Sequence, residues 1–427
     1  MSTQEPDPRE GTREEAPGAP AAAMTRGEEA RTSIVREILS GSWLVTVFAI
    51  VFALLVGAIL IAFSDPRVQE TFGYVIARPG DFFGAVWDKV TRAYSALVRG
   101  AIFDWRATTF TRMIRPATES LVFATPLILA GLAIAIPFRA GLFNIGGQGQ
   151  VIVGALFAGF VGYAVALPPV VHLLFALLGG LLGGAIYAGI SGWLKARTGA
   201  NEVIVTIMLN NIAGYLILYL LKQQWFTTST SPLPQSPNVA STASLPGLLP
   251  DPFRINAGFL LAILVTFFVW WLMERSTLGF EFRAVGANPN AARTAGISVE
   301  RVTILVMVVS GALAGLAGAN QVLGTEQKLT PGIAGSLGFD AITVALLGRS
   351  RPVGVFFAGI LFGALKAGGY VMQSQTNTPI DIILVVQSVI VLLVAAPPLV
   401  RSIFRLPAPG APRKRSPKIA KTAEVTA

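Results

Sequence analysis

Apolar and polar positions alternate in long blocks along the chain. Ten apolar runs each predict one helix: residues 42–63, 118–138, 150–167, 169–194, 203–221, 256–273, 302–323, 338–348, 352–371 and 380–400. A bilayer core about 30 Å thick needs roughly 20 apolar residues for one spanning helix. The run 338–348 is too short for that, so we expect a half-helix or a re-entrant segment there. The pattern predicts an all-α polytopic membrane protein with about ten transmembrane or re-entrant helices.

Composition agrees with this fold class and removes several kinds of chemistry. The 427 residues are 53% hydrophobic and 13% charged, with a mean hydropathy of +0.63, which is too apolar for a soluble domain of this size. The chain has no cysteine, so disulfides, thiolate metal sites and a cysteine nucleophile are excluded. The net charge of +10 would suit a nucleic-acid partner, but basic residues that flank membrane helices explain it better. We therefore expect a bilayer and no nucleic acid.

The distribution of lysine and arginine predicts the orientation. With ten crossings and an internal N-terminus, inner segments carry 21 basic residues and outer segments carry 11. Most of the outer ones lie in residues 64–117, and long loops translocate with less regard to charge. Both termini are therefore expected to be cytoplasmic.

The regions outside the spans are predicted as follows. Residues 1–41 are rich in Pro, Glu and Ala and form a disordered extension. The transmembrane domain covers 42–401, and the basic tail 402–427 contacts anionic lipid. Residues 64–117 and 222–255 form external loops, and 274–301 form a cytoplasmic one. Helical spacing of apolar residues from Phe83 to Val98 predicts an amphipathic helix at the interface, with a docking surface for an external partner as the alternative.

Glycine recurs at the spacing that lets helices approach closely in lipid. The pairs are Gly179/Gly183, Gly180/Gly184, Gly311/Gly315 and Gly359/Gly363. Small residues four positions apart allow backbone-to-backbone contact between membrane helices. We expect these faces to pack within one bundle.

Catalytic machinery is not evident. The segment Gly189–Gly192 matches the G-x-S-G pattern of intramembrane serine proteases, and His172 is the one histidine. On one helix Ser191 and His172 would lie about 28 Å apart, too far for a dyad. Neither a HExxH motif nor a phosphate-binding Gly-Lys-Ser/Thr loop occurs. We expect no catalytic residue, no metal and no cofactor.

Polar residues inside the apolar runs suggest a path for a neutral solute. Asn210 and Asn211 fall near the middle of the run 203–221. Such side chains are costly in lipid unless they bond to another helix or face a wet cavity. Each of these two side chains therefore either joins neighbouring helices or lines a path. Asp340 opens the short run 338–348, where a carboxylate favours the positive end of a helix.

The segment Ser276–Val302, "STLGFEFRAVGANPNAARTAGISVERV", carries a specific resemblance. It resembles the cytoplasmic coupling loop of bacterial ABC importer permeases of the branched-chain amino acid, ribose and nucleoside type. Three more segments match in order: "RAGLFNIGGQGQ", "ANEVIVTIMLNNIA" and "GFDAITVALLGRSRPVG". Together they cover roughly residues 120–370, and the match is most similar to the nucleoside branch. The loop residues expected to couple to an ATPase are Gly279, Arg283, Ala284, Gly286, Asn288, Ala291, Ala292 and Gly296, and Ile297 also matches the family pattern.

The resemblance implies a permease subunit of a bacterial plasma-membrane importer. Its partners would be a separate ABC ATPase, a second permease that is a paralogous chain, and an external solute-binding protein. The solute would be a nucleoside, with a simple sugar as the alternative; an ATP-independent facilitator or channel is the rival class.

The residues predicted to line the path are neutral amides, two aromatic rings and one carboxylate. Glycines and amides in residues 140–150 favour an unwound element that lines or borders a path, with a plain surface turn as the alternative. The predicted path residues are Phe143, Asn144, Gln148, Gln150, Asn210, Asn211, Asn320, Gln321, Phe339 and Asp340.

Overall fold

The computed structural model describes residues 42–227, 233–396, 399–400 and 402. The predicted disordered extension and basic tail lie outside the described residues, apart from the first position of the range 402–427. Two compact units are distinguished, residues 1–48 with 397–427, and residues 49–396. The second unit contains the site and is described by itself. Helices are the only regular elements among the described residues, with one isolated β-bridge between Gly247 and Asn256.

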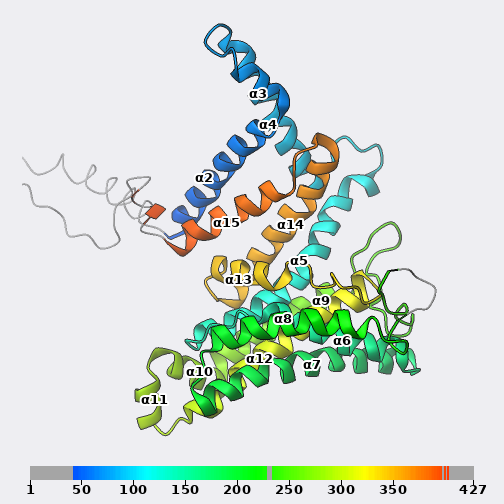
Figure 1. Cartoon of the computed structure of the whole chain (residues 1–427), viewed down its shortest axis with the longest axis vertical. Coiled ribbons are helices and arrows are strands. Elements are labelled where there is room, and N and C mark those ends of the chain that lie inside the picture. Colours follow the sequence, from blue (N-terminus) through cyan, green and yellow to red (C-terminus); the bar gives the residue numbers. More distant parts are fainter. Residues whose placement is uncertain (1–41, 228–232, 397–398, 401, 403–427) are drawn as a thin grey trace, which may run out of the picture. The chain divides into compact units, whose positions relative to one another are not determined.

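The helices follow the predicted apolar runs closely (Figure 1). In chain order they are α2 (Ser42–Phe63), α3 (Pro66–Phe72), α4 (Pro79–Ala101), α5 (Phe110–Arg139), α6 (Gly147–Ala164), α7 (Pro169–Thr198), α8 (Glu202–Leu220), α9 (Gly258–Arg275), α10 (Thr277–Ala287), α11 (Pro289–Thr294), α12 (Val299–Asn320), the π-helix η1 (Gln321–Thr325), α13 (Leu337–Leu347), α14 (Pro352–Thr376) and α15 (Asp381–Ala395).

The expected count of about ten transmembrane or re-entrant helices is not confirmed by helix length and composition. Within the described residues seven helices are long and apolar enough to cross a membrane: α5, α6, α7, α8, α9, α12 with η1, and α14. An eighth follows if α2 and α3, bent by 82° at their junction, count as one span. The other two runs form the shorter apolar helices α13 and α15. The difference arises because apolarity does not reveal how many residues of a run become helical.

Backbone contacts at glycine hold α7, α12 and α6 together. A Cβ added at Gly315 of α12 would lie 2.1 Å from the Gly180 carbonyl oxygen of α7, and one at Gly184 would lie 2.1 Å from that of Gly311. A Cβ added at Gly154 of α6 would lie 2.3 Å from the Gly315 Cα. The predicted faces Gly180/Gly184 and Gly311/Gly315 are therefore confirmed as contacts within one bundle.

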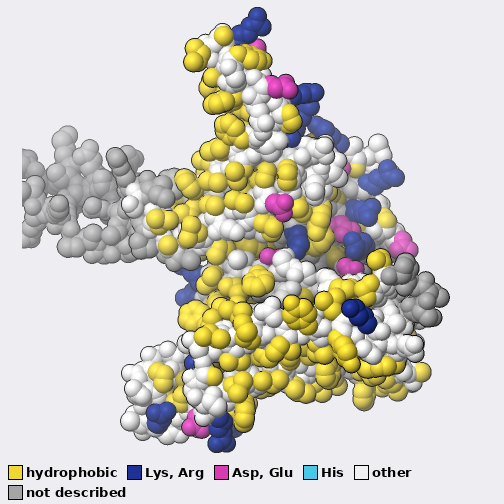
Figure 2. Space-filling model, in the orientation of Figure 1, with side chains coloured by type: hydrophobic (Ala, Val, Ile, Leu, Met, Phe, Trp, Pro, Cys, Tyr) yellow, Lys and Arg dark blue, Asp and Glu magenta, His cyan; other side chains and the backbone are white. Residues whose placement is uncertain are grey.

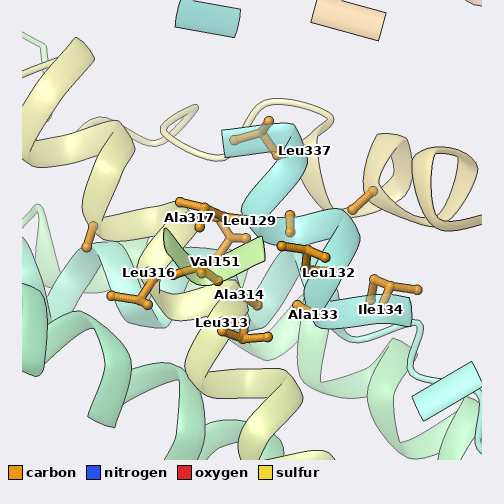
Figure 3. Close-up of a cluster of buried hydrophobic side chains, with 14 of the residues drawn as sticks. Leu129, Leu132, Ala133, Ile134, Val151, Leu313, Ala314, Leu316, Ala317 and Leu337 are labelled. Atoms are coloured by element: carbon orange, nitrogen blue, oxygen red, sulfur yellow. The ribbon is translucent and has the colours of Figure 1, made fainter. Parts of the chain in front are cut away.

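Aliphatic side chains fill the space between α5, α6, α12 and α13. Figure 3 shows this core, with Leu129, Leu132, Ala133 and Ile134 of α5 facing Val151 of α6 and Leu313, Ala314, Leu316 and Ala317 of α12. Apolar side chains also cover much of the outer face in Figure 2, as expected for a bundle in lipid. Basic side chains gather over α10 and α11 in that view. The core fixes the ends of α5 and α6, and the turn between them is the centre of the candidate site.

Candidate functional site

The turn between α5 and α6, residues 140–146, bends sharply at Gly141. This residue has φ of +72°, a conformation that glycine adopts without strain. The Leu142 amide donates back to the Pro137 carbonyl, 2.9 Å away. A Cβ at Gly141 would lie 3.2 Å from the Gly286 Cα of α10. The turn therefore touches the backbone of the predicted coupling loop directly.

Asn144 fastens this turn to α12. Its Nδ2 donates to Gln150 Oε1 at 3.0 Å and to Ser310 Oγ at 2.8 Å. Its Oδ1 accepts from the Gly146 amide at 2.9 Å and from Gln150 Nε2. Ser310 Oγ donates onward to the Ala133 carbonyl of α5. Asn144 and Gln150 are 0% and 2% exposed, so in this conformation both amides are used within the protein.

Asn210 and Asn211 are adjacent in sequence but differ in surroundings. Asn210 Oδ1 accepts from the Gly149 amide, and its Nδ2 donates to the Ile145 carbonyl, both at 2.8 Å. Asn211 is exposed, and among the described residues its side chain donates only to the Ile207 carbonyl of its own helix. Asn210 thus ties α8 to the first turn of α6, whereas Asn211 lies on the outer face of α8.

Gln148 ties the start of α6 to the start of α13. Its Nε2 donates to the Gly335 carbonyl at 2.7 Å, and its Oε1 accepts from the Gly338 amide at 2.8 Å. The second bond satisfies one of the amide groups that a helix leaves unpaired at its N-terminus. A Cβ at Gly338 would lie 2.2 Å from the Gln148 amide nitrogen. The amide and the glycine therefore hold the two helix ends in contact.

Four other predicted path residues, two of them aromatic, lie outside the hydrogen-bond network of Asn144, Gln148, Gln150 and Asn210. Phe143 and Phe339 are 58% and 55% exposed, and the Phe143 ring packs against Phe138 at 5.5 Å between centroids. Asn320 is buried with an unpaired Oδ1, beside Gly258. Ten residues of helix separate it from Ser310, or about 15 Å. Asn320 and the adjacent Gln321 therefore belong to a second polar level, away from residues 140–150.

Asp340 is held in a small charged cluster. Its Oδ2 accepts from Ser336 Oγ at 2.6 Å and lies 3.5 Å from Lys366 Nζ of α14. Lys366 Nζ also donates to Ser336 Oγ at 3.4 Å. Asp340 and Lys366 are 15% and 23% exposed at the side chain. The predicted path residue is thus one half of an ion pair.

The predicted coupling loop forms two short helices. Ser276 caps α10 by accepting from the Gly279 amide, and Asn288 caps α11 by accepting from the amides of Asn290 and Ala291. Gly296, with φ of +85°, follows the end of α11. These are the local signals expected from such a sequence.

The loop residues separate into two faces. Gly279 packs on the Leu272 carbonyl, and Gly286 packs on Arg139 and Ala140, each with no room for a Cβ. Ala292 is buried, and Ala284 is half-buried. Arg283 is half-buried with an unpaired buried Nη1. Asn288, Ala291 and Gly296 are exposed and form the outward face.

An ion pair closes the same end of the bundle. Arg139 Nη1 lies 2.6 Å from Glu274 Oε1. Both line a hollow of about 640 Å³ together with Arg275 and Arg351. The ends of α5 and α9 and the start of α14 therefore lie near the coupling loop.

Several residues of the site were not predicted. Ser310 stands in an apolar run with nothing local to mark it, and Lys366 is an isolated charge in the apolar run 352–371. His172 contacts Thr242 Oγ1 and the Val161 carbonyl, while Ser191 donates to Ala188 of its own helix. Both side chains of the rejected dyad thus have other partners.

Comparison with known proteins agrees with this arrangement. The family model described as branched-chain amino acid transport system / permease component matches residues 117–395. A guanosine ABC transporter permease protein of Bacillus subtilis is 38% identical, covering 74% of this chain and 88% of the relative. A glucose ABC transporter permease protein of Haloferax volcanii is 38% identical over 64% of this chain and 74% of its own length. A nucleoside ABC transporter permease protein of Lactococcus lactis is 33% identical over 82% and 90%. The chain therefore belongs to the family of branched-chain amino acid transport system permease components.

Proposed function

We propose that this chain is the membrane-spanning permease subunit of an ATP-binding-cassette importer. The observation that carries the proposal is the contact of Gly286 with Arg139 and Ala140, where a Cβ would lie 2.5 Å from the Arg139 carbonyl oxygen. An ATPase that binds the exposed face of α11 would push through α10 onto the turn 140–146. Asn144 bonds that turn to α12, Asn210 bonds it to α8, and Gln148 bonds the adjoining first turn of α6 to the start of α13.

The membrane topology follows from a span that is only half helical. Leu329 exchanges hydrogen bonds with Ser236 in the loop 222–255. Gly335 and Gly338 lie beside Gln148, and Arg351 shares a hollow with Arg139. We propose that residues 329–351 cross the bilayer as an extended stretch followed by α13. Non-helical backbone is tolerated at that depth where protein surrounds it.

With that crossing, ten segments pass through the membrane. The segments are α2, α5, α6, α7, α8, α9, α12, 329–351, α14 and α15. An even number returns the chain to its starting side, and the distribution of lysine and arginine supports the cytoplasmic side for both termini in the plasma membrane of a bacterium. The loops 64–117 and 222–255 are then external, on the side where a solute-binding protein would dock.

A second permease subunit completes the path. Only 17% of the spanning part of α8 is buried in this chain. Asn211 and Phe339 are exposed, and their chain neighbours Asn210 and Gly338 bond to Gly149 and Gln148 in the first turn of α6. Because a polar amide is costly in lipid, we propose that a paralogous permease covers this surface and that the solute passes between the two chains.

The solute is a nucleoside, with a simple sugar as the second candidate. Two relatives are named for guanosine and nucleosides and one for glucose. Amides, exposed aromatic rings and one carboxylate suit a neutral solute with hydroxyl groups. A permease of this kind is a transport component, and its ATP hydrolysis belongs to the partner ATPase.

Two measurements in the native host test the proposal. Tagged protein should co-purify with an ATPase, and uptake of labelled adenosine should stop when ATP is depleted. Excess unlabelled nucleoside should compete with this uptake, and excess ribose should not. Uptake that survives ATP depletion, with no ATPase recovered, would establish the facilitator class instead. Competition by ribose alone would establish the sugar permease.

A further inference from the structure

A lysine and an aspartate form an ion pair inside the bundle. Lys366 lies in the spanning helix α14, and Asp340 lies in the first turn of α13. Lys366 Nζ is 3.5 Å from Asp340 Oδ2 and 3.4 Å from Ser336 Oγ. Ionisable groups within membrane segments are costly and are kept where they serve transport or pair with each other. The pair is therefore expected to serve either transport or the structure of the bundle.

Packing fixes where Lys366 can reach. Gly363, one turn before it, contacts the backbone of Ser120 and Ala124 in α5. Gly369, almost one turn after it, faces Ile380 and Ile383 at the start of α15. The lysine thus projects from a helix that neighbours hold on two sides, toward the N-terminus of α13.

Only one oxygen of the Asp340 carboxylate has hydrogen-bond partners among the described residues. Ser336 and Lys366 both bind Oδ2, at 2.6 Å and 3.5 Å. Among the described residues no group donates a hydrogen bond to Asp340 Oδ1. This oxygen is also not fully buried. An ionised carboxylate accepts strong hydrogen bonds from hydroxyl groups. One oxygen is therefore anchored while the other is available.

The neighbours of Asp340 suit a sugar-bearing solute. The exposed ring of Phe339 precedes it, and the half-buried Gln148 fixes the backbone on either side of Leu337. The positive end of α13 and the Lys366 ammonium both attract the negative charge of a carboxylate at this position. Hydroxyl groups on a sugar ring could donate to Oδ1 while an apolar face rests on Phe339.

We propose that Lys366 is a positioning residue, which with Ser336 orients the ionised Asp340 carboxylate so that Oδ1 accepts hydrogen bonds from the hydroxyl groups of the passing solute. This inference rests on the proposed function. It adds Lys366 and Ser336 to the residues that line the path. Neither was among the predicted path residues. It also makes the solute's sugar hydroxyls the feature that the permease itself recognises.

The test uses the complete importer in proteoliposomes with its binding protein present. Lys366→Met leaves the carboxylate without its partner and should lower the rate of adenosine uptake by about tenfold to a hundredfold. Lys366→Arg keeps the charge and should retain most of the rate. Lys222→Met, an exposed lysine just past α8, removes the same charge elsewhere and should transport like the wild type.

The double variant Lys366→Met/Asp340→Asn separates positioning from folding. Breaking a buried pair is more damaging than removing both charges, so the double variant should recover the yield and thermal stability of the folded protein. Its uptake should stay low, because no carboxylate remains to meet the hydroxyls. Recovery of uptake together with stability would overturn the proposal and make the pair a structural tie.

A competition measurement supplies a second readout. Adenosine should compete for wild-type uptake about tenfold better than 2′,3′-dideoxyadenosine, and Asp340→Asn should reduce that ratio. The binding protein is identical in both assays, so a change reports on the permease. If Asp340→Asn left the ratio of competition by the two nucleosides unchanged, or if Lys366→Met transported at the wild-type rate, the positioning role of Lys366 would be contradicted. The proposed function would not be affected by either result. Absence of ATP-driven uptake by the wild type would instead refute the proposed function.

Discussion

Replacing Gly315 by alanine tests the backbone contact at the centre of the bundle. The added Cβ would lie 2.1 Å from the Gly180 carbonyl oxygen and 3.1 Å from the Gly184 Cα, both in α7. Ordinary van der Waals contact begins at 3.4 Å, so α12 and α7 would have to separate by about 1.3 Å. Gly154 of α6 is in contact from another side, and backbone atoms cannot move aside as a flexible side chain can.

The size of the destabilisation by Gly315→Ala follows from two opposing contributions to the free energy of unfolding. Overpacking a close-packed interior costs about 1–3 kcal/mol, and rigid backbone on both sides favours the upper half of this range. Alanine is a better helix former than glycine by about 1 kcal/mol. The net destabilisation of Gly315→Ala should therefore be about 1–2 kcal/mol. Gly214→Ala on α8 is the matched control, because no atom lies within 4 Å of its added Cβ.

Thermal unfolding of the purified variants in one detergent measures the difference. Gly315→Ala should lower Tm relative to the wild type, while Gly214→Ala should leave Tm unchanged or raise it slightly. If the two variants unfolded at the same temperature, the close approach of α7 and α12 would be refuted. Gly184→Ala should behave like Gly315→Ala, since its Cβ would lie 2.1 Å from the Gly311 carbonyl oxygen.

Three further predictions concern other parts of the chain. Gly286→Asp should insert normally but lose ATP-driven uptake, because any side chain meets the Arg139 carbonyl oxygen at 2.5 Å; uptake at the wild-type rate would remove this contact from the coupling route. Asn210→Leu should lower both Tm and uptake, since it leaves the Ile145 carbonyl of the turn and the Gly149 amide of α6 without this partner, whereas Asn211→Leu should keep Tm; equal effects of the two changes would contradict the assignment. Burial would raise the pKa of Asp65, but hydrogen bonds from Lys89 and a backbone amide outweigh it and lower that pKa below its usual range. The stabilisation is thus present above the unfolded-state pKa of about 4 and is lost as the pH falls through the lower folded-state value. The Tm difference between wild type and Asp65→Asn should shrink on acidification, and a constant difference would exclude the ion pair as its cause.

Local signals in the sequence predicted the elements well. Apolar runs predicted where the long helices lie, because a membrane helix must be apolar along its whole length. The spacing of Gly311 and Gly315 predicted a contact face, since four residues nearly complete a helical turn. Asn288 predicted the start of α11 through its cap. Each of these features depends on residues close together in the chain.

Features that depend on distant residues were not predictable. Ser310 receives a hydrogen bond from a residue 166 positions earlier, and nothing near it in sequence marks that partner. The ion pair of Lys366 with Asp340 required knowing that α14 faces the start of α13. The helical extent of each span was not predictable for a similar reason, because residues 326–336 reach α13 without forming a long helix. Tertiary packing decided all three.

ATP-driven uptake by the purified complex is the most direct test of the account. The chain would be isolated from its host with its ATPase and second permease, placed in liposomes with the solute-binding protein outside, and supplied with labelled adenosine. With ATP on the ATPase side, label should accumulate inside above its external concentration. Without ATP, or with Gly286→Asp in place of the native chain, the label should not accumulate. Equal uptake with and without ATP would contradict the assignment as an ATP-driven importer permease.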